Sequence, residues 1–162
     1  MSDYAWLLDT NIISNIVRFP QGQAAQQLEL IDNDAVCTSI IVAAELRYGA
    51  AKLGSTRFAE RLESVLELLP ILALEPPADR EYGDIRAYLE RKGMLIGPND
   101  MLIAAQARAG DMAVVTDNVG EFGRVPRLRV INWLRGGAAV AHEPPPRHHS
   151  APRKTTRPRK KK

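Results

Sequence analysis

The sequence predicts an α/β domain in which helices flank a central, mostly parallel β-sheet. Three observations support this fold class. Short apolar segments alternate along the chain with longer segments of helical periodicity, which is typical of strand–helix–strand units. Several of the short segments are apolar throughout, as expected for strands covered on both faces. The 162 residues, 45% of them hydrophobic, are enough for one domain with a sizeable core.

Five short segments are expected to form the strands of this sheet. They are rich in Val, Ile, Leu and Ala, and four of them contain no charged residue. Short strands of this kind favour a buried position in a parallel sheet. In chain order the expected strands span residues 5–8, 35–39, 71–74, 113–116 and 129–133.

Six longer segments have helical periodicity. In chain order they span residues 10–19, 23–31, 39–53, 55–69, 78–93 and 99–110. Their boundary residues support the assignment. Ser39 is a typical N-cap residue, and Gly93 is a typical residue at a helix end. Pro98 stands just before the last segment and Gly110 closes it, which matches the usual preference for Pro at helix starts and Gly at helix ends.

The end of the chain differs in composition from the rest. Residues 143–162 contain five prolines, eight Lys or Arg and a single acid, which leaves 14 basic and 18 acidic residues in 1–142. We expect a folded domain over 1–136 and a Pro-rich basic tail over 137–162 that is disordered. The basic overall charge belongs to this tail, so it is no evidence that the folded part binds nucleic acid.

The chain is expected to be cytoplasmic. Its one cysteine, Cys37, excludes an internal disulfide and fits a reducing compartment. The apolar run near the N-terminus is too short for a secretory leader or a membrane span, and no basic segment precedes it.

Four acidic residues are expected at one edge of the sheet. Asp9 and Asp117 follow expected strands directly, Asp100 opens a helix, and Glu45 lies about two turns into another helix. The carboxyl ends of parallel strands and the helix starts beyond them form the edge where ligands bind. Each acid also has an ordinary explanation, as a helix cap, a turn residue or a solvated helix position.

A cluster of carboxylates would repel itself, and a hard divalent cation would relieve that repulsion. Mg²⁺ is the expected ion and Mn²⁺ an alternative, because both prefer oxygen ligands. Zinc is a poor candidate, since residues 1–142 offer only Cys37 and His142 as soft ligands. A carboxylate-held Mg²⁺ suits phosphoryl chemistry.

Four motifs in the chain resemble those of the PIN-domain ribonucleases, and most closely those of the VapC toxins of bacterial toxin–antitoxin pairs. In order they read "LLDTNIIS", "TSIIVAAELRYGA", "IGPNDMLIAAQARA" and "VVTDNVGEFGRVPRLRVINW", and the similarity covers roughly residues 4–134. The resemblance implies a PIN-like fold, a Mg²⁺-dependent endoribonuclease activity and usually a homodimer. It also implies inhibition by a VapB-type antitoxin within a hetero-oligomer, and no association with a membrane.

The resemblance also implies roles for individual residues. Asp9, Asp100 and Asp117 match metal-binding carboxylates, and Glu45 matches a fourth acid that often acts through a metal-bound water. Asn11 and Thr116 match polar residues that support the acids. The last acidic position stays open, because Asn118 or Glu121 could share the role of Asp117.

The expected reaction is hydrolysis of an RNA phosphodiester by a metal-activated water, with Glu45 assisting its deprotonation. This route leaves a 5′-phosphate and a 3′-hydroxyl. Since an acidic site repels RNA, nearby bases must attract the backbone. The candidates are Arg47 and Arg124 in the folded part and, in the tail, Arg153, Lys154, Arg157 and Arg159.

Other classes of protein are less consistent with the chain. A haloacid-dehalogenase-like phosphatase would need a second Asp two residues after Asp9, where this chain has Asn11. A phosphate-accepting receiver domain would need adjacent acids near the N-terminus and a late Lys. The main alternative is a catalytically inert PIN-like module that binds RNA or a partner, although a pure RNA binder gains nothing from a negative pocket.

Overall fold

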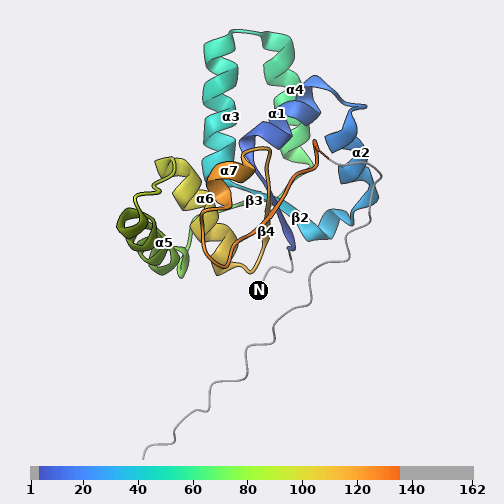
Figure 1. Ribbon diagram of the computed structural model, residues 1–162. Helices are drawn as coiled ribbons and strands as arrows, with labels where there is room; N and C mark the ends of the chain where they lie inside the picture. The colour runs from blue at the N-terminus through green and yellow to red at the C-terminus, as the bar shows by residue number, and fades with distance from the viewer. Residues whose placement is uncertain (1–3, 136–162) are drawn as a thin grey trace, which may run out of the picture.

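The computed structural model describes residues 4–135, so the predicted tail over 137–162 lies outside the described residues. Five strands alternate with the helices of this region (Figure 1). The strands are β1 (Trp6–Leu8), β2 (Val36–Ser39), β3 (Ile71–Leu72), β4 (Ala113–Val115) and β5 (Arg129–Ile131). The α-helices are α1 (Thr10–Arg18), α2 (Gln23–Leu30), α3 (Ile40–Leu53), α4 (Thr56–Glu67), α5 (Ala78–Lys92), α6 (Pro98–Ala109) and α7 (Val119–Phe122).

The strands form one sheet in the order β3-β2-β1-β4-β5, and every pairing within it is parallel. The predicted α/β class with a parallel sheet is therefore confirmed. Strand β1 is central: Leu7 is in register with Cys37 on one side and Val114 on the other. Strands β2 and β3 lie on one side of β1, and the later strands β4 and β5 lie on the other. This change of side at β1 creates the crevice in which open α/β sheets bind ligands.

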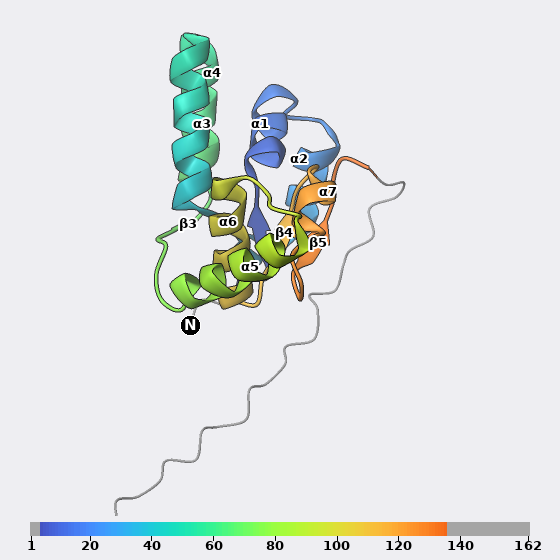
Figure 2. The same cartoon turned by 60° about the vertical axis from the view of Figure 1, so that its left-hand side comes forward.

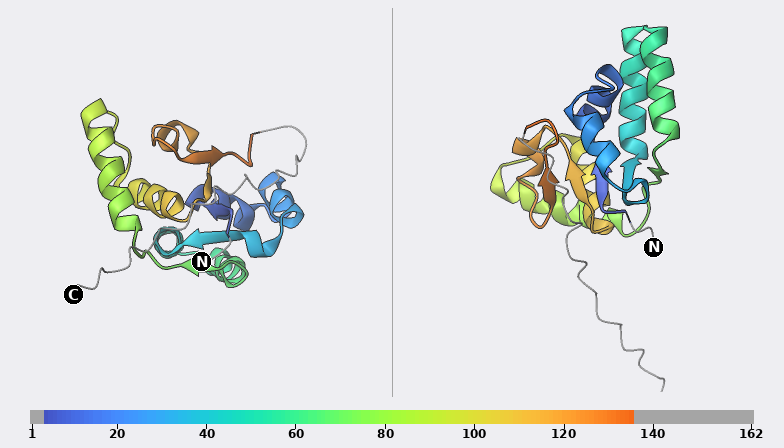
Figure 3. Two further views of the ribbon diagram at one scale, coloured as in Figure 1. Left: turned by 90° about the horizontal axis from the view of Figure 1, so that it is seen from below. Right: turned by 90° about the vertical axis from the view of Figure 1, so that its right-hand side faces the viewer.

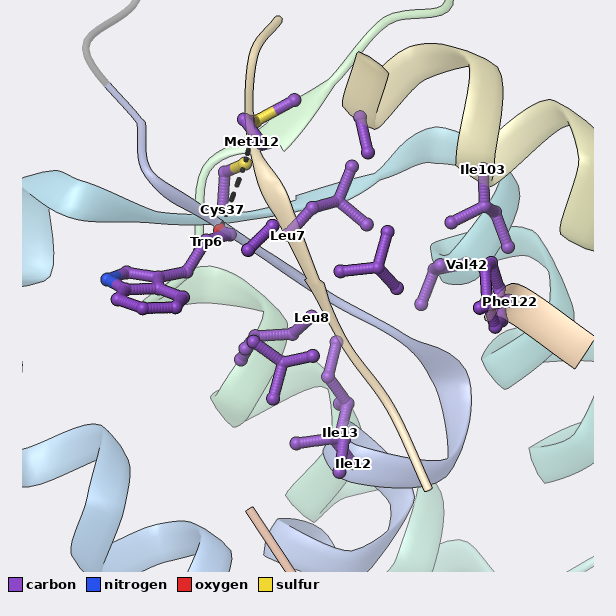
Figure 4. Close-up of a cluster of buried hydrophobic side chains, with 14 of the residues drawn as sticks. Trp6, Leu7, Leu8, Ile12, Ile13, Cys37, Val42, Ile103, Met112 and Phe122 are labelled. Carbon is purple, nitrogen blue, oxygen red and sulfur yellow. Dashed lines mark hydrogen bonds between the residues drawn. The ribbon is translucent and has the colours of Figure 1, made fainter. Parts of the chain in front are cut away.

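The core surrounds β1 and its two neighbours, whose residues are buried on both faces of the sheet (Figure 4). Leu7, Val36 and Val114 are fully buried, as is Cys37, whose thiol packs beside Met112. Burial raises the pKa of Cys37 to about 12, so this thiol stays protonated and inert. The continuous apolar segments in the sequence are explained by this double coverage.

The helix boundaries follow from the capping residues. The Ser39 side chain accepts a hydrogen bond from the Ile41 N–H at the start of α3. Gly93 ends α5 with φ 63°, a conformation that favours glycine, and Pro98 is the first residue of α6. The six predicted helices are present within one to two residues, whereas the sequence did not predict the short helix α7.

Helices α3 and α4 form an antiparallel hairpin that stands away from the rest of the domain (Figures 1 and 2). Helix α1 packs against both of them, and α5 packs against α6 on another side of the molecule (Figure 3). Within residues 4–135, no helix is both long and apolar enough to cross a membrane.

Candidate metal centre

Asp9 lies at the end of the central strand and is almost completely buried, with 4% of its surface exposed. It occupies the N-cap position of α1, yet its side chain makes no capping hydrogen bond. One carboxylate oxygen instead accepts hydrogen bonds from the Thr116 hydroxyl at 2.7 Å and from the Asn11 amide at 3.1 Å. Burial raises the pKa of Asp9, and the nearby charge of Glu45 raises it further, while these hydrogen bonds lower it.

Asn11 and Thr116 hold Asp9 in a fixed network, and the sequence singled out both residues. Asn11 donates to the Thr116 hydroxyl at 3.1 Å and accepts the Asp117 N–H at 2.9 Å. The Thr116 hydroxyl also accepts the Asn118 N–H at 3.0 Å. The network joins the ends of β1 and β4 across about a hundred residues of sequence, and it leaves the other oxygen of Asp9 free of side-chain donors within the described region.

Glu45 projects from α3 toward the same edge, and two polar side chains fix its orientation. The Thr10 hydroxyl donates to one carboxylate oxygen, and the Asn99 amide donates to the other at 2.8 Å. Neither residue was predicted from the sequence. A signal was present, because Thr10 follows Asp9 directly and Asn99 directly precedes Asp100.

Asp100 lies in the first turn of α6 and is half-buried. Its pKa is raised to about 7 by burial, by the charge of Asp9, by a hydrogen bond and charge from Glu121, and by the charge of Glu45. The Asn118 amide approaches it at 3.4 Å. Three carboxyl groups from distant parts of the chain, those of Asp9, Glu45 and Glu121, are therefore close enough to Asp100 to act on its pKa.

Asp117 also lies at this edge of the sheet, but its carboxylate is directed elsewhere. One oxygen accepts the Asn132 amide at 2.9 Å and pairs with Arg135 at 3.1 Å. Its charge is not among the causes of the raised pKa of Asp9 or Asp100. The predicted acids Asp9, Glu45 and Asp100 therefore lie close together, whereas the Asp117 carboxylate contacts Asn132, just after β5, and Arg135.

Glu121 is the fourth acid of the cluster. It lies on α7 and accepts the Gly97 N–H, just before α6, at 3.4 Å, and it is close enough to Asp100 to raise the pKa of that group. The sequence leaves this position open between Asp117, Asn118 and Glu121. The proximity of Glu121 to Asp100 favours Glu121.

The carboxylate oxygens of this cluster are the kind of ligand that a hard divalent cation prefers. Among the described residues, no three His, Cys, Asp or Glu side chains are already arranged around a point where an ion could bind. Mg²⁺ does not require such a cage, because it is usually held by one or two carboxylates and keeps several waters. A cation between Asp9 and Asp100 would also offset the burial that raises the pKa of both groups and the charge of Asp9 that raises the pKa of Asp100 further.

The basic residues selected as RNA contacts are less available than the sequence suggested. Arg47 forms a bidentate pair with Glu63, with both N···O distances at 2.9 Å. Arg124 donates to the Leu95 carbonyl at 3.3 Å. The four candidates in the tail, Arg153, Lys154, Arg157 and Arg159, lie outside the described residues.

The parallel sheet and its acidic edge are typical of a class of nuclease-like domains. Comparison with protein families shows which family of this class the chain belongs to. The family model described as PIN domain matches residues 6–128. The chain belongs to the PIN-domain family.

Within this family the chain is similar to VapC ribonucleases. It is 37% identical to "Ribonuclease VapC2" of Rickettsia felis over 130 residues, which cover 79% of this chain and 97% of that protein. It is 34% identical to the "tRNA(fMet)-specific endonuclease VapC" of Salmonella typhimurium, with 79% and 97% covered. Among solved structures, VapBC2 from Rickettsia felis bound to a promoter DNA fragment has a TM-score of 0.73 at 35% identity, with 80% and 98% covered. These relatives confirm the predicted PIN-like fold and VapC type.

Protons and a divalent cation compete for the same carboxylates, so the affinity for the cation is expected to depend on pH. Because the pKa of Asp100 is about 7, a cation must displace a proton from the cluster below that pH. Mg²⁺ affinity is expected to fall about tenfold per pH unit below pH 7 and to level off above it. Calorimetric titration with Mg²⁺ between about pH 5.5 and 8.5 measures this dependence. An affinity that does not change across this range would contradict the assignment of Asp100.

Proposed function

We propose that this protein is the toxin of a VapBC-type toxin–antitoxin pair and cleaves RNA as a divalent-metal-dependent endoribonuclease in the cytoplasm. The observation that carries the proposal is the convergence of Asp9, Glu45, Asp100 and Glu121 at the crevice beside β1. Neighbouring carboxylates with no Lys or Arg partner in the described region, two of which have a raised pKa, suit a cation and a phosphoryl substrate.

Asp9 and Asp100 are the proposed ligands of Mg²⁺, with Mn²⁺ as a substitute, and Glu121 supports the same ion. A bound Mg²⁺ would supply charge stabilisation to the phosphodiester and lower the pKa of the attacking water. Glu45, whose orientation is supported by hydrogen bonds from Thr10 and Asn99, is the proposed acceptor of the proton of that water. Asn11 and Thr116 keep Asp9 in position. The products expected are a 5′-phosphate and a 3′-hydroxyl.

The fourth acidic position can be tested by a matched pair of substitutions. Glu121→Gln is expected to reduce RNA cleavage roughly tenfold or more, because it removes a charge from the cluster around Asp100. Asp117→Asn is expected to have a smaller effect, since the Asp117 carboxylate is already engaged by Asn132 and Arg135. Steady-state cleavage rates of the two variants measure the difference. A larger loss for Asp117→Asn would assign the metal ligand to Asp117, as the sequence predicted.

The similarity to VapC proteins also suggests the partners of this protein. We propose a VapB-type antitoxin as the inhibitor, because the solved relatives include VapBC complexes from Rickettsia felis and Salmonella typhimurium. A homodimer is the proposed assembly of the toxin, as the resemblance to VapC toxins implies. The relative named a tRNA(fMet)-specific endonuclease makes tRNA(fMet) the first substrate to assay.

The function is tested by incubating the purified full chain with tRNA(fMet) and with total RNA in Mg²⁺, in Mn²⁺ and in excess EDTA. Cleavage with 5′-phosphate ends is expected in both metals and none in EDTA. Binding of RNA without cleavage in any metal would favour the alternative, an inert PIN-like binding module. Cleavage that continues in EDTA would reject the metal mechanism.

A further inference from the structure

A groove of about 360 Å³ lies between α1, α3 and α4, directly beside the acidic cluster. Thr10 and Glu45 form the end of the groove that belongs to the candidate metal centre, where their side chains are hydrogen-bonded to each other. Arg18 from α1 and Lys52 from α3 line it as well. Figure 2 shows α1 lying alongside the α3–α4 hairpin that forms the other walls. The groove therefore leads from the acids to two cations.

The separation of the two ends follows from helix geometry. Glu45 and Lys52 are seven residues apart on α3, and Thr10 and Arg18 are eight residues apart on α1. At 1.5 Å rise per residue, the acidic and basic ends are about 10–12 Å apart. A phosphate bound at the basic end therefore lies within one or two nucleotides of the cleaved bond.

The two cations have no acidic partner in the part of the chain that the structure describes. The guanidinium of Arg18 instead lies 5.6 Å from the centroid of the Phe58 ring. This contact leaves its charge available to a ligand, in contrast to Arg47, which Glu63 neutralises. Unpaired cations within a net acidic domain are the groups most able to attract an RNA backbone.

The middle of the groove is apolar and open. Leu46, Leu53 and Phe58 line it, and Gly49 adds no side chain. A Cβ placed on Gly49 would meet no atom within 4 Å, so the space beside it is free. Bases of single-stranded RNA bind to aromatic and apolar surfaces flanked by basic groups, with little dependence on sequence. A volume of about 360 Å³ is also within the usual range for small-ligand sites.

We propose that this groove binds a nucleotide within one or two positions of the cleaved phosphodiester of the RNA substrate. Its base packs against Phe58 and the apolar wall, and its phosphate binds Arg18 and Lys52. The proposal rests on the proposed ribonuclease function, because it assumes an RNA ligand at the acidic end.

The charge contribution is tested by RNA binding, with cleavage blocked. The full chain carrying Asp9→Asn is titrated against a fluorescein-labelled, single-stranded 12-nucleotide RNA in Mg²⁺ at several KCl concentrations, and anisotropy is recorded. Adding Arg18→Gln and Lys52→Gln is expected to weaken binding about tenfold or more and to reduce the salt slope by about 1.4, which corresponds to two phosphate contacts. The control pair Arg61→Gln and Arg80→Gln removes the same charge from exposed residues that do not line the groove, and it is expected to weaken binding less than about twofold.

The space in the groove is tested by filling it. Gly49→Leu places a side chain in the open volume, and Gly83→Leu makes the same change at an exposed glycine of α5 that also has no neighbour within 4 Å. Both replace a helix-interior glycine by a better helix former, so both are expected to keep or raise Tm. Only Gly49→Leu is expected to weaken RNA binding, by about tenfold, and to raise KM for cleavage in the chain that retains Asp9.

The proposal would be overturned if the groove pair and the control pair of Gln substitutions weakened RNA binding equally, or if the two leucine variants did. It would also be overturned if Gly49→Leu left RNA binding unchanged but allowed the protein to escape antitoxin inhibition. The last result would assign the groove to a protein partner. These outcomes differ from failure of the proposed function, in which the unmodified chain binds the RNA and does not cleave it in any metal.

Discussion

Replacing Asp9 by Asn is expected to reduce RNA cleavage at least about 100-fold while leaving the fold intact. A metal-assisted reaction gains several kcal/mol from the ion, and loss of a primary ligand removes much of that stabilisation. The fold survives because the oxygen of an Asn side chain still accepts the hydrogen bonds of Thr116 and Asn11 that Asp9 accepts. Multiple-turnover cleavage of tRNA(fMet) in Mg²⁺, with circular dichroism on the same samples, measures both effects.

Asp9→Ala provides the contrasting variant. It leaves the buried Thr116 hydroxyl without its acceptor and removes one of the two acceptors of the Asn11 amide, at a cost of about 1–3 kcal/mol in the free energy of unfolding. Both variants are expected to be inactive, and only the alanine variant is expected to be clearly less stable. An Asp9→Asn protein that cleaves RNA at the unmodified rate would remove Asp9 from the metal centre.

Replacing Asp100 by Asn is expected to make the metal-free protein more stable and the enzyme inactive. The pKa of Asp100 is about 7 in the folded protein, well above its ordinary value of 3.8. Ionising this carboxyl group therefore costs folding stability: the contribution is fully present below about pH 4 and is lost as the pH rises through about 7. Asn carries no charge, so the variant keeps that stability at pH 8.

The expected gain is modest because Asp100 is half-exposed and solvent screens its charge. We expect Tm in EDTA at pH 8 to rise by up to about 3 °C and the difference to vanish near pH 4, where the native carboxyl group is protonated. Scanning calorimetry at the two pH values measures it. A variant that is less stable at pH 8 would show that Asp100 is not repelled by its neighbours.

The sheet and helices were predictable because their signals are local. Apolar segments without alternation indicated strands buried on both faces, and Ser39, Gly93 and Pro98 marked helix boundaries through backbone chemistry that acts within a few residues. Helix α7 was missed because it has a single turn and few residues in which a periodic pattern can develop.

The acidic cluster was predictable in part. The strand ends and helix starts identified Asp9, Asp100 and Glu45 as residues of one edge, and the structure brings these three together. The sequence could not determine which way the Asp117 side chain turns, because this depends on Asn132 and Arg135, which lie beyond the next strand. The contacts of Thr10 and Asn99 with Glu45 likewise depend on how α1, α3 and α6 pack.

The central claim is that acids distant in the sequence bind one divalent cation at the crevice beside β1. Diffraction from crystals of the protein grown with Mn²⁺, recorded at a wavelength where manganese scatters anomalously, tests it most directly. We expect a manganese peak within ligand distance, about 2.0–2.3 Å, of carboxylate oxygens of Asp9 and Asp100, with Glu45 and Glu121 around it. A manganese peak bound away from Asp9 and Asp100, or no peak in crystals of an active preparation, would contradict it.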